Sequence, residues 1–220
     1  MSMIDLDAFR AAPLGRDPFD HIVVGDFVRP ESVPDVQRDY PRLDIAGSVP
    51  LGLAPHGPAF DRLMEELRGD AIERAFSAKF GLDLSEFPRM VTVRSVCRPG
   101  DGSVHVDAAN KVVTVLIYMN PPWQEAGGRL RLLRSPDLAD SAAEVPPLQG
   151  TLLAFRRSET SWHGHESYAG PRRAIQMNWV RRGFYAWQEQ LRHRAIAWWK
   201  LRSGTDWRLG GAGSEGDQAA

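Results

Sequence analysis

The stretch that decides the fold is HVDAANKVVTVLIYMNPPWQEAGGRLRLL, residues 105–133. It opens on a histidine and an aspartate two positions apart, which lead into a mostly apolar run over 112–119. A proline pair and a Gly-Gly pair then precede a second apolar segment, 129–134. Short runs rich in valine, isoleucine and leucine between turn residues are typical of β-strands. The stretch therefore predicts two strands, with two metal-binding residue types directly before the first.

Similar short segments flank this stretch on both sides. Residues 90–97, 150–156 and 173–180 are rich in β-branched and aromatic residues, and Gly, Pro and Asp separate them. Because few helical patterns lie between these segments, the sheet should be mostly antiparallel. The pattern predicts an α+β, mainly β fold, with a sandwich or jelly-roll barrel core.

The N-terminal part of the chain predicts helices that support this core. Residues 18–27 read as an edge strand, Pro30 to Tyr40 as a short helix, and the Pro- and Gly-rich segment 41–58 as a loop. Over 59–80 apolar residues recur at helical spacing, which predicts one amphipathic helix, or two broken near Gly69. We expect these helices to pack on the sheet.

The C-terminal part returns to helical spacing over 183–202, with tryptophans on one face and basic residues among them. Packing of this face against the sheet is favoured over binding to a membrane or a partner, because exposed tryptophans are costly. From residue 203 the chain is Gly-rich and polar. We therefore expect a single domain over 1–202 and a disordered tail over 203–220.

Composition narrows the possible functions. The chain has 220 residues and a formal net charge of −1, from 27 Lys and Arg against 28 Asp and Glu, so no overall charge favours nucleic acid or anionic membranes. Cys97 is the only cysteine and excludes an intrachain disulfide. The first ten residues do not resemble a secretory signal, and the longest apolar run, 112–119, falls far short of the roughly 20 residues of a membrane span. A cytoplasmic protein is expected.

His105 and Asp107 are the first candidate metal ligands. In an extended segment residues i and i+2 point to the same face, so both can reach one ion. A third ligand must come from a distant strand, and His163 and His165 both qualify by position. Two histidines and one carboxylate are typical of non-haem Fe(II) oxygenases. Catalytic zinc is the rival, although the HExxH pattern of zinc hydrolases does not occur here.

An Fe(II) site of this kind leaves positions open for a cosubstrate such as 2-oxoglutarate, whose distal carboxylate needs a cation. Arg172 and Arg173 begin the strand that follows the histidines, and Arg173 shares a face with Ile175, Met177 and Trp179. The alternative is that both arginines are solvated residues at the end of a strand.

The ordered motifs resemble the prolyl-hydroxylase-like Fe(II)/2-oxoglutarate-dependent dioxygenase superfamily. The HxD triplet is followed by Tyr-Met-Asn at 118–120, Trp123 and Gly-Gly-Arg-Leu-Arg-Leu at 127–132. The later segment, GTLLAF followed by SWHGHESYAGPRRAIQMNW (161–179), is similar to the second half of that pattern. The resemblance covers residues 90–180.

The resemblance implies a double-stranded β-helix (jelly-roll) core with N-terminal buttressing helices and a C-terminal helix. It implies that His105, Asp107 and His163 ligate Fe(II), because the spacing to Arg173 and the later tryptophan selects His163 over His165. Arg173 would pair with the distal carboxylate of 2-oxoglutarate. Tyr118 would donate its hydroxyl to that carboxylate, or it is an ordinary aromatic of the barrel.

The implied reaction uses O2 and 2-oxoglutarate to hydroxylate a C–H bond of the substrate, while 2-oxoglutarate is converted to succinate. Asp107 favours hydroxylation, since related halogenases lack this carboxylate. Arg98, before Pro99-Gly100, departs from the pattern because some members carry a tyrosine there. The substrate is a small molecule, an amino acid or a peptidyl residue, and the loops at 41–58, 98–104 and 135–149 should recognise it. A zinc- or nickel-binding jelly-roll protein and a non-catalytic binding module are the alternatives.

Overall fold

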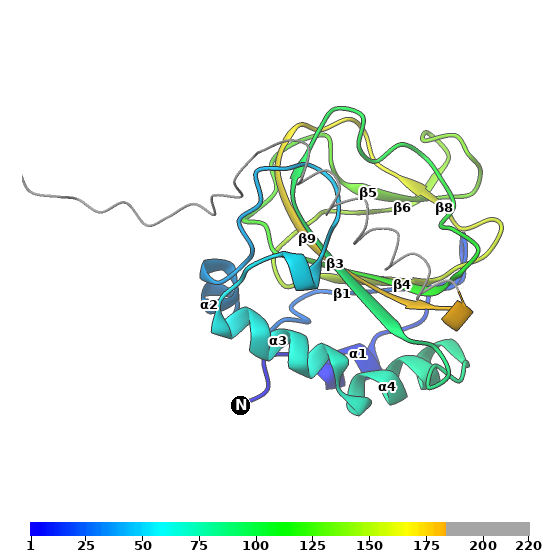
Figure 1. Cartoon of the computed structure of the whole chain (residues 1–220). Helices are drawn as coiled ribbons and strands as arrows, with labels where there is room; N and C mark the ends of the chain where they lie inside the picture. The colour runs from blue at the N-terminus through cyan, green and yellow to red at the C-terminus, as the bar shows by residue number, and fades with distance from the viewer. Residues whose placement is uncertain (184–220) are drawn as a thin grey trace, which may run out of the picture.

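A computed structural model describes residues 1–183, and its largest element is a six-stranded antiparallel sheet. The order is β1-β7-β4-β9-β3-β2, so strands far apart in sequence lie side by side (Figure 1). The strands are β1 (His21–Val24), β2 (Val49–Pro50), β3 (Arg89–Cys97), β4 (Lys111–Tyr118), β7 (Leu152–Arg156) and β9 (Gly170–Val180). The longest strand, β9, lies between β3 and β4, and it has more paired residues than any other strand of the described sheet.

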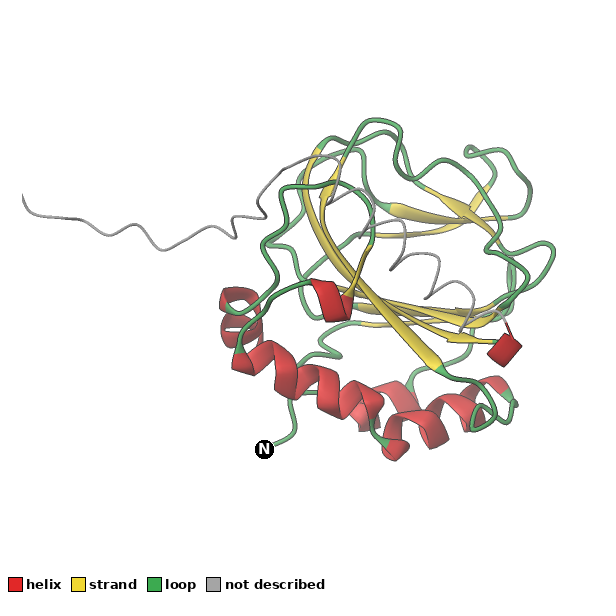
Figure 2. Ribbon diagram, in the orientation of Figure 1, coloured by secondary structure: helices red, strands yellow, loops and turns green. Residues whose placement is uncertain are grey.

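A smaller antiparallel sheet faces the first one. Its order is β6-β5-β8, with β5 (Leu130–Leu133) between β6 (Ser141–Val145) and β8 (Trp162–Gly164). Figure 2 shows this sheet on the opposite side of the large sheet from the helices. A cluster of buried residues that includes Tyr118, Leu132 and Phe155 draws on strands of both sheets. Two facing antiparallel sheets with N-terminal helices are consistent with a jelly-roll.

Four helices cover the other face of the large sheet (Figure 2). They are α1 (Leu6–Ala11), α2 (Val33–Arg38), α3 (Pro58–Arg68) and α4 (Asp70–Phe80). Gly69 ends α3 and begins α4 in an extended conformation, which confirms the predicted break. The larger hydrophobic core lies between these helices and the sheet, and it includes Phe76 from α4 and Trp179 from β9.

The five predicted core strands, the edge strand, the short helix and the broken helix are confirmed. The prediction missed α1, β2, β6, β8 and the 3-10 helix Leu51–Leu53. Of these, β2 and the 3-10 helix lie in the expected loop 41–58, and β6 lies in the expected loop 135–149. These elements are short, and β6 and β8 are held mainly by pairing with β5, so local patterns identify them poorly. The helix predicted over 183–202 and the tail over 203–220 lie outside the described residues, except for residue 183. Within residues 1–183, no helix is both long and apolar enough to cross a membrane.

Candidate active site

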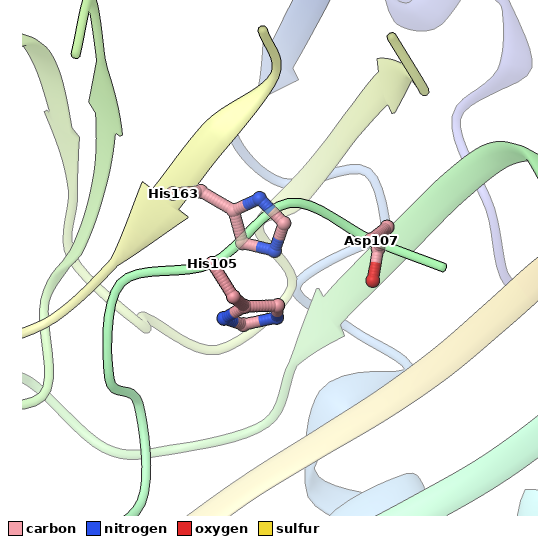
Figure 3. A group of neighbouring side chains, drawn as sticks. All are labelled: His105, Asp107 and His163. Atoms are coloured by element: carbon pink, nitrogen blue, oxygen red, sulfur yellow. The ribbon is translucent and has the colours of Figure 1, made fainter. Parts of the chain in front are cut away.

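His105, Asp107 and His163 come together between the two sheets, as Figure 3 shows. One ligand atom from each lies within 4.8 Å of the others. The two histidines are joined through their backbones, because each amide nitrogen donates to the other's carbonyl oxygen at 3.0 Å. His163 belongs to β8, where it pairs with Leu132 of β5. The sheet pairing therefore positions two ligands that are far apart in the sequence.

Hydrogen bonds fix the tautomer of both histidines. Nδ1 of His105 lies 2.8 Å from the carbonyl oxygen of Ser103, and Nδ1 of His163 lies 3.0 Å from that of Ser161. A carbonyl oxygen only accepts hydrogen bonds, so each Nδ1 carries the proton. The lone pair of Nε2 is then available to a metal on both rings, which is the usual arrangement of histidine ligands.

Asp107 is buried and held as a carboxylate. Lys111 Nζ donates to Oδ1 at 2.5 Å, and Thr114 Oγ1 donates to Oδ2 at 2.5 Å. Burial alone would raise the pKa of Asp107, but the nearby Lys111 ammonium, with His163 and Thr114, holds this pKa below its usual value. Each oxygen accepts about two hydrogen bonds or ligands, so the carboxylate can still bind a metal.

The triad opens into a cavity of about 210 Å³ between the sheets. His105 is exposed, whereas Asp107 and His163 are buried. Burial lowers the pKa of His163 to about 4, so its imidazole is neutral and can act as a ligand at neutral pH. The cavity is also lined by Ser48, Thr92, Arg94, Gly102, Lys111, Thr114, Leu116, Leu130, His165, Arg172, Ala174 and Gln176.

Arg172 supplies a buried cation to this cavity. Its side chain lies over the ring of Tyr118, at 5.2 Å from the guanidinium carbon to the ring centroid, and its Nε donates to the carbonyl oxygen of Gly128 at 2.8 Å. Within residues 1–183, neither Arg172 Nη2 nor the Tyr118 hydroxyl has a hydrogen-bond partner, although both atoms are buried. Buried donors without a partner are rare, and these two suit a carboxylate from a ligand.

The Gly-Gly pair explains how Arg172 is held. At Gly127 a Cβ atom would lie 2.3 Å from the carbonyl oxygen of Ser167, so no side chain fits there. Gly128 has a φ of +77°, a conformation that favours glycine. The pair therefore lets the backbone approach closely and present the Gly128 carbonyl to Arg172.

Arg173 lies on the other face of β9 and does not line the cavity. Its guanidinium lies 5.7 Å from the ring centroid of Tyr40. Alternation along a strand places Arg172, Ala174 and Gln176 on the cavity side. The signal for Arg172 was present in the sequence, because its face carries small and polar residues, while the face of Arg173 carries the core residues Ile175, Met177 and Trp179.

The structure also places the remaining candidates. Tyr118 is fully buried under the Arg172 guanidinium, and its expected role toward 2-oxoglutarate stays a prediction. His165 is buried and lines the cavity, but it is not part of the ligand group. Arg98 is exposed, whereas Arg94 of β3 lines the cavity. Sequence reasoning did not identify Arg94, Lys111 or Thr114 as residues of the site.

Two histidines and one carboxylate converging in this way define a mononuclear metal site of the non-haem Fe(II) oxygenase class. Residues 93–181 match the family model described as the 2OG-Fe(II) oxygenase superfamily. The matched residues hold all three ligands, so the chain is a 2-oxoglutarate-dependent non-haem iron oxygenase with an intact His-Asp-His triad, and its cofactors are Fe(II) and 2-oxoglutarate.

Solved structures show the same fold at low sequence identity. A prolyl-4-hydroxylase from Pseudomonas putida is 18% identical with a TM-score of 0.54, over 80% of this chain and 97% of that one. An oxidoreductase of the 2OG-Fe(II) oxygenase family from Burkholderia pseudomallei is 15% identical with a TM-score of 0.52, over 82% and 92% of the two chains. No curated protein sequence matches the chain.

Proposed function

We propose that this oxygenase hydroxylates a C–H bond of its substrate, with O2 as oxidant and conversion of 2-oxoglutarate to succinate and CO2. In this proposal His105, Asp107 and His163 ligate Fe(II) and are the catalytic residues. The single observation that carries it is the convergence of their three ligand atoms within 4.8 Å. The retained carboxylate of Asp107 favours hydroxylation.

We further propose that Arg172 and Tyr118 bind the distal carboxylate of 2-oxoglutarate. The two buried donors without partners, Arg172 Nη2 and the Tyr118 hydroxyl, support this assignment. It replaces the expectation for Arg173, whose side chain lies over Tyr40 on the other face of β9. Arg172 would supply charge and Tyr118 a directed hydrogen bond.

The rest of the cavity prepares the triad for metal binding. When bound, Fe(II) with 2-oxoglutarate supplies the activation of O2. Lys111 and Thr114 orient the Asp107 carboxylate and keep it ionised. The carbonyl groups of Ser103 and Ser161 accept hydrogen bonds from Nδ1 of the two imidazoles, which leaves Nε2 as the nitrogen that binds the metal. These contacts reduce the reorganisation that metal binding requires.

The fold in this proposal is the double-stranded β-helix, and the substrate is a small molecule, an amino acid or a peptidyl residue. Some structural neighbours are prolyl 4-hydroxylases, so peptidyl proline is one substrate to test. Two of the three expected recognition segments contribute to the cavity wall, through Ser48 and Gly102. The third, 135–149, contributes β6 to the small sheet instead.

The test is an anaerobic titration of metal-free protein with Fe(II) and then with 2-oxoglutarate. The titration is monitored by the visible absorption of the iron–2-oxo acid chelate. We expect the band in wild type and its loss in His163→Ala. Succinate released after admission of air then measures turnover. Absence of the band in folded protein, with tight binding of Zn(II), would favour the zinc alternative.

The matched control is His165→Ala. His163 and His165 are both buried, at 5% and 6% exposure, and both line the cavity. Only His163 belongs to the ligand group. We therefore expect His165→Ala to keep the absorption band, and its loss there would contradict the assignment of the third ligand.

A further inference from the structure

Arg94 brings a second guanidinium to the end of the cavity that holds Arg172. It lies in β3 and pairs in register with Ala174 of β9, which shares the cavity face with Arg172 two residues away. Arg94 and Arg172 therefore lie near each other on adjacent strands, on the same face of the sheet. Both line the cavity.

The charge of Arg94 is only loosely paired. Asp101 Oδ2 lies 3.5 Å from its Nη1, and the Cys97 sulfur lies 3.7 Å from the same nitrogen. Charge-assisted hydrogen bonds between nitrogen and a carboxylate are usually about 2.7–2.9 Å long. Asp101 also accepts a hydrogen bond from the backbone nitrogen of Arg98 at 2.9 Å. The Arg94 guanidinium can therefore turn to another anion with only a modest loss of free energy from its contact with Asp101.

The two guanidiniums converge on the same neighbours. Burial raises the pKa of Tyr118, and the charges of Arg172 and Arg94 both oppose this effect. His165 lines the cavity together with both arginines. This end of the cavity therefore carries two guanidiniums, and the Arg172 guanidinium lies over the Tyr118 ring, at 5.2 Å from the guanidinium carbon to the ring centroid.

We propose that Arg94 is a second cationic residue for the distal carboxylate of 2-oxoglutarate, beside Arg172 and Tyr118. A carboxylate offers about four lone pairs, enough to accept from all three groups. With Arg94 engaged, the site selects a dicarboxylic 2-oxo acid over a monocarboxylic one of the same length. This inference rests on the proposed function, since it assumes that the triad binds iron and the 2-oxo acid.

The experiment measures dissociation constants by isothermal titration calorimetry, with anaerobic protein loaded with Fe(II). The ligands are 2-oxoglutarate and 2-oxopentanoate, which lacks only the distal carboxylate. We expect Arg94→Met to weaken 2-oxoglutarate binding about tenfold, the value of one charged hydrogen bond, and to leave 2-oxopentanoate binding unchanged. Arg94→Lys should recover part of the loss, because it restores the charge.

The controls are Arg172→Met and Arg173→Met. Arg172→Met should weaken 2-oxoglutarate binding more than Arg94→Met does, and Arg173→Met should have no effect, since Arg173 lies on the other face. Thermal unfolding of each variant checks that it is folded. If Arg94→Met leaves 2-oxoglutarate affinity within twofold of wild type, or weakens both ligands equally, the inference is overturned. Failure of wild type to bind either 2-oxo acid would instead contradict the proposed function.

Discussion

The two faces of β9 have different roles, although the side chains on them alternate residue by residue along one strand. Arg172, Ala174 and Gln176 line the metal cavity, whereas Ile175 and Trp179 are buried in the core under the helices. The face that lines the cavity, called here the inner face, carries polar or small side chains because a ligand must fit against it. The outer face is apolar because it anchors the helices. Function and stability are therefore separated by the alternation of a strand.

In the cavity that the inner face of β9 lines, replacement of Asp107 by Ala should lower the Fe(II) affinity most. Even partners outside the metal shell cost about 10–100-fold in affinity when removed, so loss of a ligand should cost more than about 100-fold. We expect no chelate absorption and no succinate, with the fold kept. Asp101→Ala removes a carboxylate outside the triad and should keep Fe(II) affinity. Iron-dependent turnover by Asp107→Ala would show that the cavity does not depend on this ligand, which would contradict the functional role given to the inner face.

Replacement of Trp179 by Ala should have the largest effect on the outer face. Trp179 is fully buried and packs against Phe76 of α4, at 5.0 Å between ring centroids. Truncation of such a side chain costs about 3–5 kcal/mol of unfolding free energy. Urea unfolding of metal-free protein measures the loss, and Gln176→Ala on the inner face is the control with a smaller loss. Equal losses in both variants would argue against separated faces.

A lower pH should reduce the unfolding free energy because His163 is protonated more readily in the unfolded chain than in the folded protein. A histidine in the unfolded chain has a pKa near 6.5, and burial lowers the pKa of His163 to about 4 in the folded protein. Between these values the unfolded chain binds a proton that the folded protein excludes. The unfolding free energy of metal-free protein should therefore fall by about 3 kcal/mol as the pH drops from 6.5 to 4. His163→Gln should flatten this profile, and an unchanged slope in that variant would contradict the assignment.

Replacement of Thr114 by Val should have the smallest effect of the four. Thr114 Oγ1 donates its single hydrogen to Asp107 Oδ2 at 2.5 Å, and valine keeps the shape without the hydroxyl. Fe(II) affinity should fall about 10–100-fold, the usual cost of losing a partner of a metal ligand. The affinity comes from the anaerobic titration, with Thr92→Val, also on the cavity wall, as the control. An unchanged affinity in Thr114→Val would show that Lys111 alone orients Asp107.

Local sequence determined much of the architecture and part of the site. Strand patterns identified β3, β4, β7 and β9, and helical spacing with Gly69 identified α3 and α4. The His-x-Asp triplet places two ligands on one segment because neighbouring residues define their relative position. Gly128 of the Gly-Gly pair also has a local meaning, since its φ of +77° favours glycine. These features depend on a few adjacent residues, so the chain alone reveals them.

Tertiary structure decided which side chains of those strands meet. A shift of one residue turns every side chain of a strand to the other face, and the pairing of β9 with β3 and β4 fixes which face borders the cavity that Arg172 lines. The same pairing brings Arg94 beside it, and the backbone contact between His105 and His163 sets the third ligand. Such contacts join residues that are distant in the chain. Their geometry follows from how the sheets pack, which no local pattern encodes.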